Sequence, residues 1–148
     1  DNWAIDACPH HGPAISIAPD GTYHVTWFTN APHRHGLFYA RSADGGKTFS
    51  APLNFGRYAA QAGHAHVSSL GKSVFIAWKE FDGVSSRIQL MRSDDGGGHW
   101  SPAQPVAATK GASDHPLLIN NGHEVYLSWN TLQDGYQLVP VGGIEARK

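Results

Sequence analysis

A ten-residue turn sequence occurs twice in this chain and constrains its fold more than any other feature. The first copy begins at Arg41 and reads RSADGGKTFS, and the second begins at Arg92 and reads RSDDGGGHWS. The copies lie 51 residues apart, and the same interval separates Trp27, Trp78 and Trp129, each in a short apolar run. A period of roughly 40–50 residues, rich in short strands and tight turns, is typical of the blades of a β-propeller.

Both copies fit the pattern S-x-D-x-G-x-T/H-F/W, which resembles the Asp-box of the sialidase and BNR-repeat families, with His99 where that motif usually has threonine. An aspartate can accept hydrogen bonds from backbone N–H groups of its own turn, and glycine adopts backbone angles closed to other residues. The aromatic residue that follows is expected to anchor the turn by burying its ring. We interpret the motif as a folding device, with the structural residues Ser42, Asp44, Gly46, Phe49, Ser93, Asp95, Gly97 and Trp100.

The resemblance and the repeat together predict an all-β chain, a β-propeller segment of sialidase type. Residues 1–148 are expected to form a single segment that supplies about three four-stranded blades of a six-bladed ring. Its predicted parts are an N-terminal strand and Cys/His loop (1–13), blade one (14–58), blade two (59–109) and an incomplete blade three (110–148). No stretch holds apolar residues at helical spacing for three turns, so no helix is expected.

Alternating apolar residues bounded by Gly, Asn and Asp turns predict the individual strands. A short strand is expected at Trp3–Ile5. The other expected strands are 14–18, 23–29, 36–42 and 52–55 in blade one, 64–69, 73–80, 87–93 and 103–107 in blade two, and 115–119, 124–130 and 136–141 in blade three.

A propeller usually needs four to eight blades to close, and an open arc leaves the faces of its end blades exposed to water. We therefore expect a partner that completes the ring. The remaining blades could come from the same polypeptide, from another subunit, or from a second copy of this chain whose N-terminal strand around Trp3 completes blade three. The abrupt start at Asp1 favours a processed or excised segment, and no signal peptide is visible.

Composition excludes some classes of function. Charged residues are 16% of the chain and the net charge is −1, so nothing predicts binding to nucleic acid or to an anionic membrane surface. No apolar run is long enough for a transmembrane helix. The single cysteine, Cys8, excludes an intramolecular disulfide. An extracytoplasmic location, periplasmic or secreted, is what the family resemblance implies.

The resemblance also implies what a sialidase would need. That family clamps the sialic acid carboxylate with three arginines, uses a tyrosine nucleophile activated by a glutamate, and uses an aspartate as acid and base. Arg34 and Arg57 lie in predicted loops and are the candidate ligand-binding residues. Glu80 and Glu124 are interpreted as solvated strand ends, and no family arginine motif is recognisable.

Ten histidines are an unusual number beside one cysteine and one methionine. His64 and His66 are expected to share a face of one strand because alternate side chains do so, and His115 is the repeat partner of His64. A copper or zinc site is one hypothesis, because imidazole and thiolate suit those metals, and its candidate ligands are Cys8, His10, His11, His64, His66 and His115. The alternative is that these histidines bond to loop backbone or line the rim of a channel.

The leading functional hypothesis from the sequence is a non-catalytic, extracytoplasmic propeller module that binds a glycan, a small ligand or a protein partner, with a histidine-rich metal site as one option. The alternative is part of a sialidase-class glycoside hydrolase whose remaining catalytic residues lie outside these 148 residues. The sequence leans away from an enzyme without deciding the question, and fold alone does not settle function.

Overall fold

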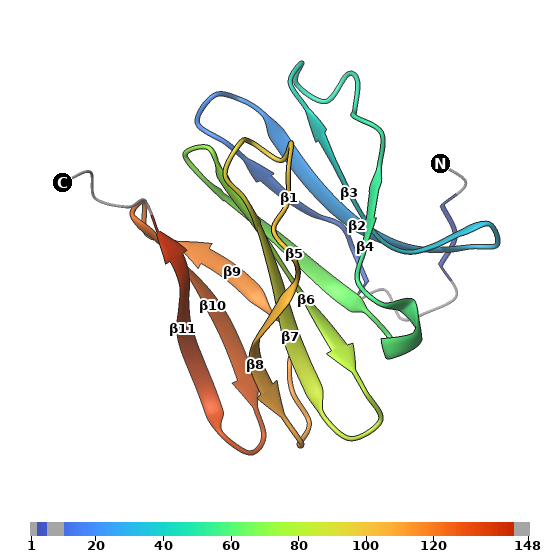
Figure 1. The fold of residues 1–148 in the computed structure, drawn as a ribbon, viewed down its shortest axis with the longest axis vertical. Helices are drawn as coiled ribbons and strands as arrows, with labels where there is room; N and C mark the ends of the chain where they lie inside the picture. Colours follow the sequence, from blue (N-terminus) through green and yellow to red (C-terminus); the bar gives the residue numbers. More distant parts are fainter. Residues whose placement is uncertain (1–2, 6–10, 144–148) are drawn as a thin grey trace.

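The computed structural model describes residues 3–5 and 11–143, and these ranges form an all-β structure. Three antiparallel sheets follow one another along the chain, and Figure 1 shows them side by side in chain order. The helical content of the described ranges is one 3-10 turn, η1 (Tyr58–Ala60). The expected all-β class is therefore confirmed.

Each sheet is a meander in which every strand pairs with the next one in the chain. Sheet A contains β1 (Ala14–Ile17), β2 (Tyr23–Ala31), β3 (Arg34–Ser42) and β4 (Leu53–Phe55). Sheet B contains β5 (Gly63–Leu70), β6 (Ser73–Phe81), β7 (Ser86–Ser93) and β8 (Gln104–Thr109). Sheet C contains β9 (Leu117–Asn120), β10 (Glu124–Thr131) and β11 (Gly135–Gly143).

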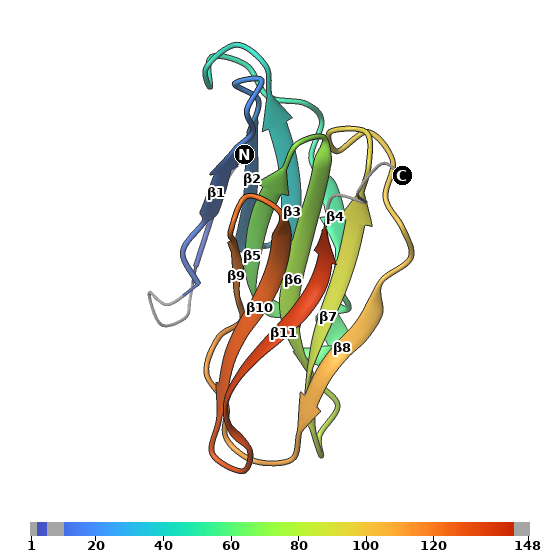
Figure 2. The same cartoon turned by 90° about the vertical axis from the view of Figure 1, so that its left-hand side faces the viewer.

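The sheets pack face to face through two apolar cores, and the first strand of each sheet lies against the first strand of the next (Figure 2). Trp78 is buried in the core between sheets A and B, and Trp129 is buried in the core between sheets B and C. The 51-residue period thus places the same side chain against the preceding sheet. Trp27 holds the equivalent place on sheet A but is only half-buried, because no sheet of the described ranges covers that face.

The two repeated turns have the same internal hydrogen bonds. The Ser42 hydroxyl donates to Asp44 Oδ1 at 2.8 Å and accepts from the Gly46 N–H at 2.9 Å. Asp44 also accepts from the backbone N–H and the hydroxyl of Thr48. Together these bonds, those from Thr48 first, lower the pKa of Asp44 to about 2.

The second turn, Ser93 to His99, repeats these bonds with a different side chain at its end. His99 Nδ1 lies 2.5 Å from Asp95 Oδ2, so the imidazole takes the place of the Thr48 hydroxyl. Gly97 has φ +84°, and a Cβ at that position would collide with the Tyr39 hydroxyl of sheet A. The second turn therefore packs against the neighbouring sheet as well as closing its own hairpin.

The expectation that both aromatic residues of the motif are buried is wrong for the first copy. Trp100 packs edge-on against Tyr39 of the preceding sheet, with ring centroids 4.9 Å apart. Phe49 is 50% exposed. An aromatic residue at this position of the motif packs against the sheet that precedes its own. Phe49 belongs to sheet A, which is the first sheet of the described ranges, so its ring has no such partner there.

The predicted strand at Trp3–Ile5 is absent, although this segment lies along β2. The Asn30 N–H donates to the Ala4 carbonyl at 2.7 Å, and Trp3 Nε1 donates to the Phe28 carbonyl at 2.9 Å. These three residues thus continue along the edge of sheet A beyond Ala14, the first residue of β1, without forming a regular ladder.

Candidate functional site

A cavity of about 430 Å³ lies where the ends of β2 and β6 meet the start of β5. Its lining combines three aromatic rings with two imidazoles and one amine: the residues are His11, Phe28, Tyr58, Gln61, Ala62, His64, Lys79 and Phe81. We call it the His64 cavity. The two repeated turns lie at the opposite ends of the strands, because β2 and β6 run from the turn side to the cavity side.

The backbone departs from regular geometry at this cavity. Gln61 and His64 have φ values of 53° and 54°, and they are the non-glycine residues with positive φ in the described part of the chain. The pairing of β5 with β6 also shifts register between Gly63 and His66. Non-glycine residues held in the left-handed region cost about 1–2 kcal/mol each, and such strain gathers at functional sites. Both of these residues line the cavity.

Three imidazoles from separate segments come together beside the cavity. The rings of His64 and His115 stack with centroids 3.6 Å apart and planes 13° from parallel. The His11 ring lies 4.1 Å from that of His64 and 4.8 Å from that of Phe28. The repeat interval between His64 and His115 thus places both at the same level of adjacent sheets.

His66 does not join this group, contrary to the expectation that it shares a face with His64. The register shift between Gly63 and His66 breaks the alternation of side chains on which that expectation rested. The His66 ring instead lies toward sheet C, where Nδ1 accepts a hydrogen bond from the Leu118 N–H at 3.1 Å. Burial lowers the pKa of His66, which favours this neutral, accepting form.

No group of three or more potential metal ligands converges within residues 3–5 and 11–143. Two of the candidate ligands, Cys8 and His10, lie outside the described residues. The rings of His64 and His115 instead stack nearly parallel. A copper or zinc ion at these histidines stays a prediction.

Aromatic side chains form the mouth of the cavity. Tyr58 is 50% exposed and Phe81 is 38% exposed, while Phe28 is half-buried. The Tyr58 hydroxyl donates to Asn30 Oδ1 at 3.1 Å, and its ring lies 4.2 Å from that of His35. Exposed rings of this kind have flat apolar faces against which the C–H side of a sugar ring can pack.

A lysine and an aspartate stand beside the stacked histidines. Lys79 Nζ donates to the Ser113 carbonyl at 3.0 Å and so joins sheet B to the segment before β9. Burial lowers the pKa of Lys79, and the charge of Asp114 acts against that shift. Asp114 is exposed, and one of its oxygens accepts the His115 N–H at 2.8 Å.

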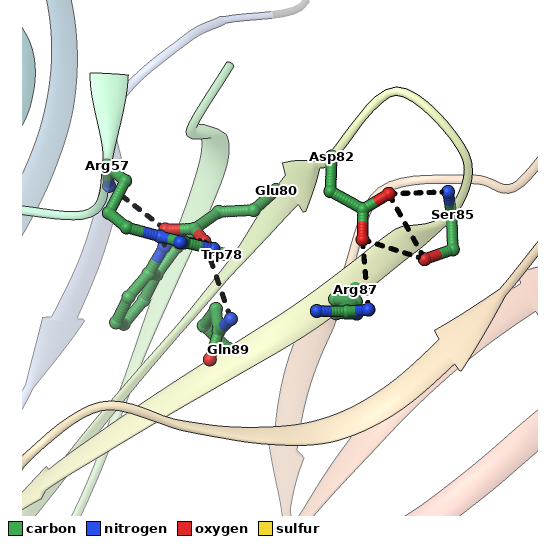
Figure 3. A network of polar contacts seen from close by, with 7 residues as sticks. All are labelled: Arg57, Trp78, Glu80, Asp82, Ser85, Arg87 and Gln89. Atoms are coloured by element: carbon green, nitrogen blue, oxygen red, sulfur yellow. Dashed lines mark hydrogen bonds and ion pairs between the residues drawn. The ribbon is translucent and has the colours of Figure 1, made fainter. Parts of the chain in front are cut away.

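Glu80 is not the solvated strand end expected from the sequence, because its side chain is 4% exposed. Figure 3 shows its carboxylate accepting hydrogen bonds from Arg57, Trp78 and Gln89. Burial alone would raise the pKa of Glu80, but the bonds from Trp78 and Arg57, with the charge of Arg57, keep it below its ordinary value. Trp78 and Glu80 are two residues apart on one strand and so share a face, which is the signal in the sequence that could have shown this burial.

Arg57 is placed by Glu80. Its backbone N–H donates to Glu80 Oε1 at 2.9 Å, while Nε and Nη2 donate to Oε2 at 3.1 and 2.9 Å. Arg34, the other candidate ligand-binding residue, begins β3 and lies over the Phe38 ring at 5.3 Å. The two arginines are therefore not brought to one site by any contact of the described residues.

The remaining arginines of the described ranges also have partners within the chain. Arg87 pairs with Asp82, Arg92 pairs with Asp94, and Arg41 donates to the Gly96 carbonyl at 2.7 Å. Three guanidinium groups that converge on one point, as a carboxylate clamp requires, are not found within residues 11–143.

Solved structures with this fold are β-propeller glycoside hydrolases. The α-L-arabinanase of Penicillium chrysogenum, complexed with arabinobiose, matches 91% of this chain with a TM-score of 0.66 and 19% identity. The α-L-arabinofuranosidase of Fusarium graminearum matches 94% with a TM-score of 0.64 and 19% identity. A family 117 glycoside hydrolase from the marine bacterium Zobellia galactanivorans matches 92% with a TM-score of 0.54 and 14% identity.

The chain spans about half the length of these structures: 46% of the first two and 55% of the third. No family model and no curated protein matches the chain at the level of sequence. The comparison supports a propeller-like glycoside hydrolase fold, and it does not single out the sialidase and BNR-repeat type that the sequence analysis expected.

The leading functional hypothesis from the sequence, a non-catalytic binding module, is wrong by this comparison, because the neighbours in fold are catalytic arabinanases and arabinofuranosidases. The Asp-box resemblance led toward a binding role because the turn itself is structural and no catalytic arginine motif accompanies it.

No helix of the described residues is long and apolar enough to cross a membrane.

Proposed function

We propose that this chain forms part of a β-propeller glycoside hydrolase that acts on an uncharged glycan, and that the His64 cavity belongs to its substrate-binding site. One observation carries the proposal. The two left-handed non-glycine residues of the described ranges both line an aromatic cavity, in a fold shared with glycoside hydrolases. Local strain of this kind is maintained where a site has to present side chains in one fixed arrangement.

The charges around the cavity favour a neutral substrate. The guanidinium of Arg57 is paired with the buried carboxylate of Glu80, and Lys79 stands beside Asp114. An anionic sugar is best held by unpaired guanidinium groups that supply parallel N–H donors. Paired charges and exposed rings suit the hydroxyl groups and C–H faces of a neutral sugar instead. A sialidase-class activity, which the two Asp-box-like turns would favour, is the second candidate.

Most glycoside hydrolases use two carboxyl groups that flank the scissile bond. Asp114 is the candidate that these residues supply, because it lies beside Lys79 and His115 and is open to solvent. Glu80 is not a candidate general acid, since its carboxylate is ionised and fully engaged. We propose that the second carboxyl group comes from outside residues 11–143.

We further propose that additional propeller sheets cover the open faces of sheets A and C. Ile15 and Ile17 are exposed on sheet A, and Leu117 and Leu138 are exposed on sheet C. Single propeller faces of this kind bury their side chains against a neighbouring blade. The neighbours in fold have about twice the length of this chain, which is the length needed for such sheets. Native mass spectrometry of the purified protein measures whether further chains supply these sheets. We also propose an extracytoplasmic location with this function.

The test of function is hydrolysis of three substrates by the purified complete protein, with the parts that supply the remaining sheets and the second carboxyl group present: p-nitrophenyl α-L-arabinofuranoside, linear arabino-oligosaccharides and a fluorogenic sialoside. Hydrolysis of either neutral substrate is expected, with kcat/KM reduced at least about fivefold by Phe81→Ala, because one stacked ring contributes about 1 kcal/mol or more. Phe49→Ala removes an exposed ring at the opposite end of the strands and is the matched control. Cleavage of the sialoside alone would overturn the neutral-glycan proposal.

A further inference from the structure

A second cavity, of about 410 Å³, adjoins the His64 cavity. Arg57, Asp82 and the η1 turn line it on its far side, while Gln61 and Phe81 belong to the lining of both cavities. The two hollows therefore lie side by side and share one wall, and we call the pair the groove. Its lining extends from His64, past Gln61 and Phe81, to Arg57.

Arg57 is fixed in direction and still reaches solvent. Its backbone N–H, Nε and Nη2 all donate to the buried carboxylate of Glu80, as Figure 3 shows. The side chain is nevertheless 67% exposed. Nη1 makes no hydrogen bond to another described residue, and Arg57 is one of the residues that line the second cavity. A guanidinium held on one edge and open on the other is a pre-oriented donor pair.

The same carboxylate also positions the wall between the cavities. Glu80 accepts the Arg57 N–H directly before η1, and Gln61 is the C-cap of η1, with its N–H donating to the Tyr58 carbonyl at 2.9 Å. The left-handed conformation of Gln61 follows from this short, anchored turn. Glu80 thus acts as a positioning residue for three groups of the groove: the guanidinium of Arg57, the ring of Tyr58 and the side chain of Gln61.

We propose that the groove binds two consecutive units of an uncharged oligosaccharide, one in each cavity, and that Arg57 donates from Nη1 to a hydroxyl group of the sugar in the second cavity. This inference rests on the proposed function and names a second subsite for it. Phe81 and Gln61 lie between the two units. The positive charge of Arg57 is already balanced by Glu80, so the guanidinium serves as a donor to hydroxyl oxygen and not as a counter-ion for a sugar carboxylate.

The test compares the binding of arabinobiose, L-arabinose and 3′-sialyllactose by isothermal titration calorimetry. Wild-type protein is expected to bind arabinobiose at least tenfold more tightly than L-arabinose. Arg57→Ala is expected to bring the affinity for arabinobiose down to within about twofold of that for L-arabinose, and to lower the affinity for arabinobiose by a larger factor than the affinity for L-arabinose. Arg57→Lys, which keeps the charge and loses the planar fork, should lose most of the same advantage.

Arg92→Ala is the matched control, because it removes an arginine that pairs with an aspartate and lies outside both cavities. It should retain the preference for arabinobiose. Thermal unfolding of each variant establishes that the protein is folded at the temperature of the titration. A loss of affinity for arabinobiose and L-arabinose by the same factor in Arg57→Ala would overturn the second subsite.

The two proposals fail in different ways. If wild-type protein hydrolyses the neutral substrates but binds arabinobiose no more tightly than L-arabinose, the subsite is wrong and the function stands. If it neither binds nor hydrolyses neutral sugars, both are wrong. Binding of 3′-sialyllactose that exceeds that of arabinobiose and weakens with added salt would show that Arg57 recognises a carboxylate, and this too would overturn the subsite as stated.

Discussion

The imidazole rings of His64 and His115 stack at a centroid distance of 3.6 Å although one complete repeat of the sequence separates them. His64 stands at the start of β5, and His115 precedes β9, which packs against β5. The stack therefore joins the first strands of sheets B and C at the level of the cavity. It is a direct product of the 51-residue period, because equivalent positions of adjacent sheets meet at the same height.

Glu80→Ala is expected to destabilise the protein by about 2 kcal/mol, since it leaves Trp78 Nε1 and the Arg57 N–H without their acceptor. This destabilisation is smaller than the loss expected for a fully buried ion pair, because the Arg57 side chain is largely exposed. Urea unfolding followed by tryptophan fluorescence measures it. Glu124→Ala, which removes an exposed carboxylate, serves as control and should change stability by less than about 0.5 kcal/mol. Equal effects of the two variants would contradict the burial of Glu80.

Gln61→Gly is expected to raise stability and lower activity together. Glycine adopts the left-handed conformation without strain, but it also raises the conformational entropy of the unfolded chain. The net gain in the free energy of unfolding should therefore be up to about 1 kcal/mol. The same change removes a side chain shared by both cavities, so kcat/KM should fall. Gln133→Gly, in a turn without positive φ, should only destabilise. A destabilised Gln61→Gly protein would show that this backbone is unstrained.

Stability should decrease as the pH falls from about 7 toward 5. Burial lowers the pKa of His66 and of His24 below 6.5, so the unfolded chain binds protons at a pH where the folded protein does not. The stability that the two neutral histidines contribute is fully present above their pKa in the unfolded chain. It is lost as the pH falls through their lower pKa in the folded protein. His66→Gln keeps an acceptor for the Leu118 N–H and removes the titration, so its unfolding midpoint should depend less on pH across this range. An unchanged pH dependence would rule out His66 as a contributor.

A second pH effect is expected between about pH 4 and pH 2. The folded-state pKa of Asp44 is lowered to about 2, so its ionised carboxylate stabilises the first turn above the unfolded pKa near 4. This stabilisation is lost as the pH falls to about 2. Acid unfolding of Asp44→Asn should therefore be shallower than that of the wild type. Identical acid profiles would mean that the turn does not depend on the charge.

The exchange of threonine for histidine in the second turn can be tested directly. His99→Thr should restore the hydroxyl contact that Thr48 makes in the first turn and leave the unfolding temperature unchanged. His99→Ala removes the partner of Asp95 Oδ2 and should lower it. Differential scanning calorimetry at pH 7 compares the three proteins. If His99→Ala unfolds at the same temperature as His99→Thr, the contact of the imidazole with Asp95 does not contribute to stability.

Much of the fold was readable from short-range patterns. The turn at Ser42–Gly46 and its repeat are closed by bonds within five residues, so their conformation depends on local chemistry alone. Strand positions followed from alternation, and the first strands of blades two and three began within two residues of the structure's β5 and β9. The exceptions, Trp3–Ile5 and Phe49, both depend on what lies beside them in space.

The sequence by itself determined the repeat, the strand order and the level at which His64 meets His115, because a fixed period and a two-residue alternation carry that information along the chain. Only the tertiary structure decided the ion pair of Glu80 with Arg57, the diversion of His66 toward sheet C and the groove at Arg57. These depend on a register shift and on an ion pair between β6 and the segment that joins sheets A and B. Such contacts join residues whose spacing follows no period, so no pattern in the chain predicts them.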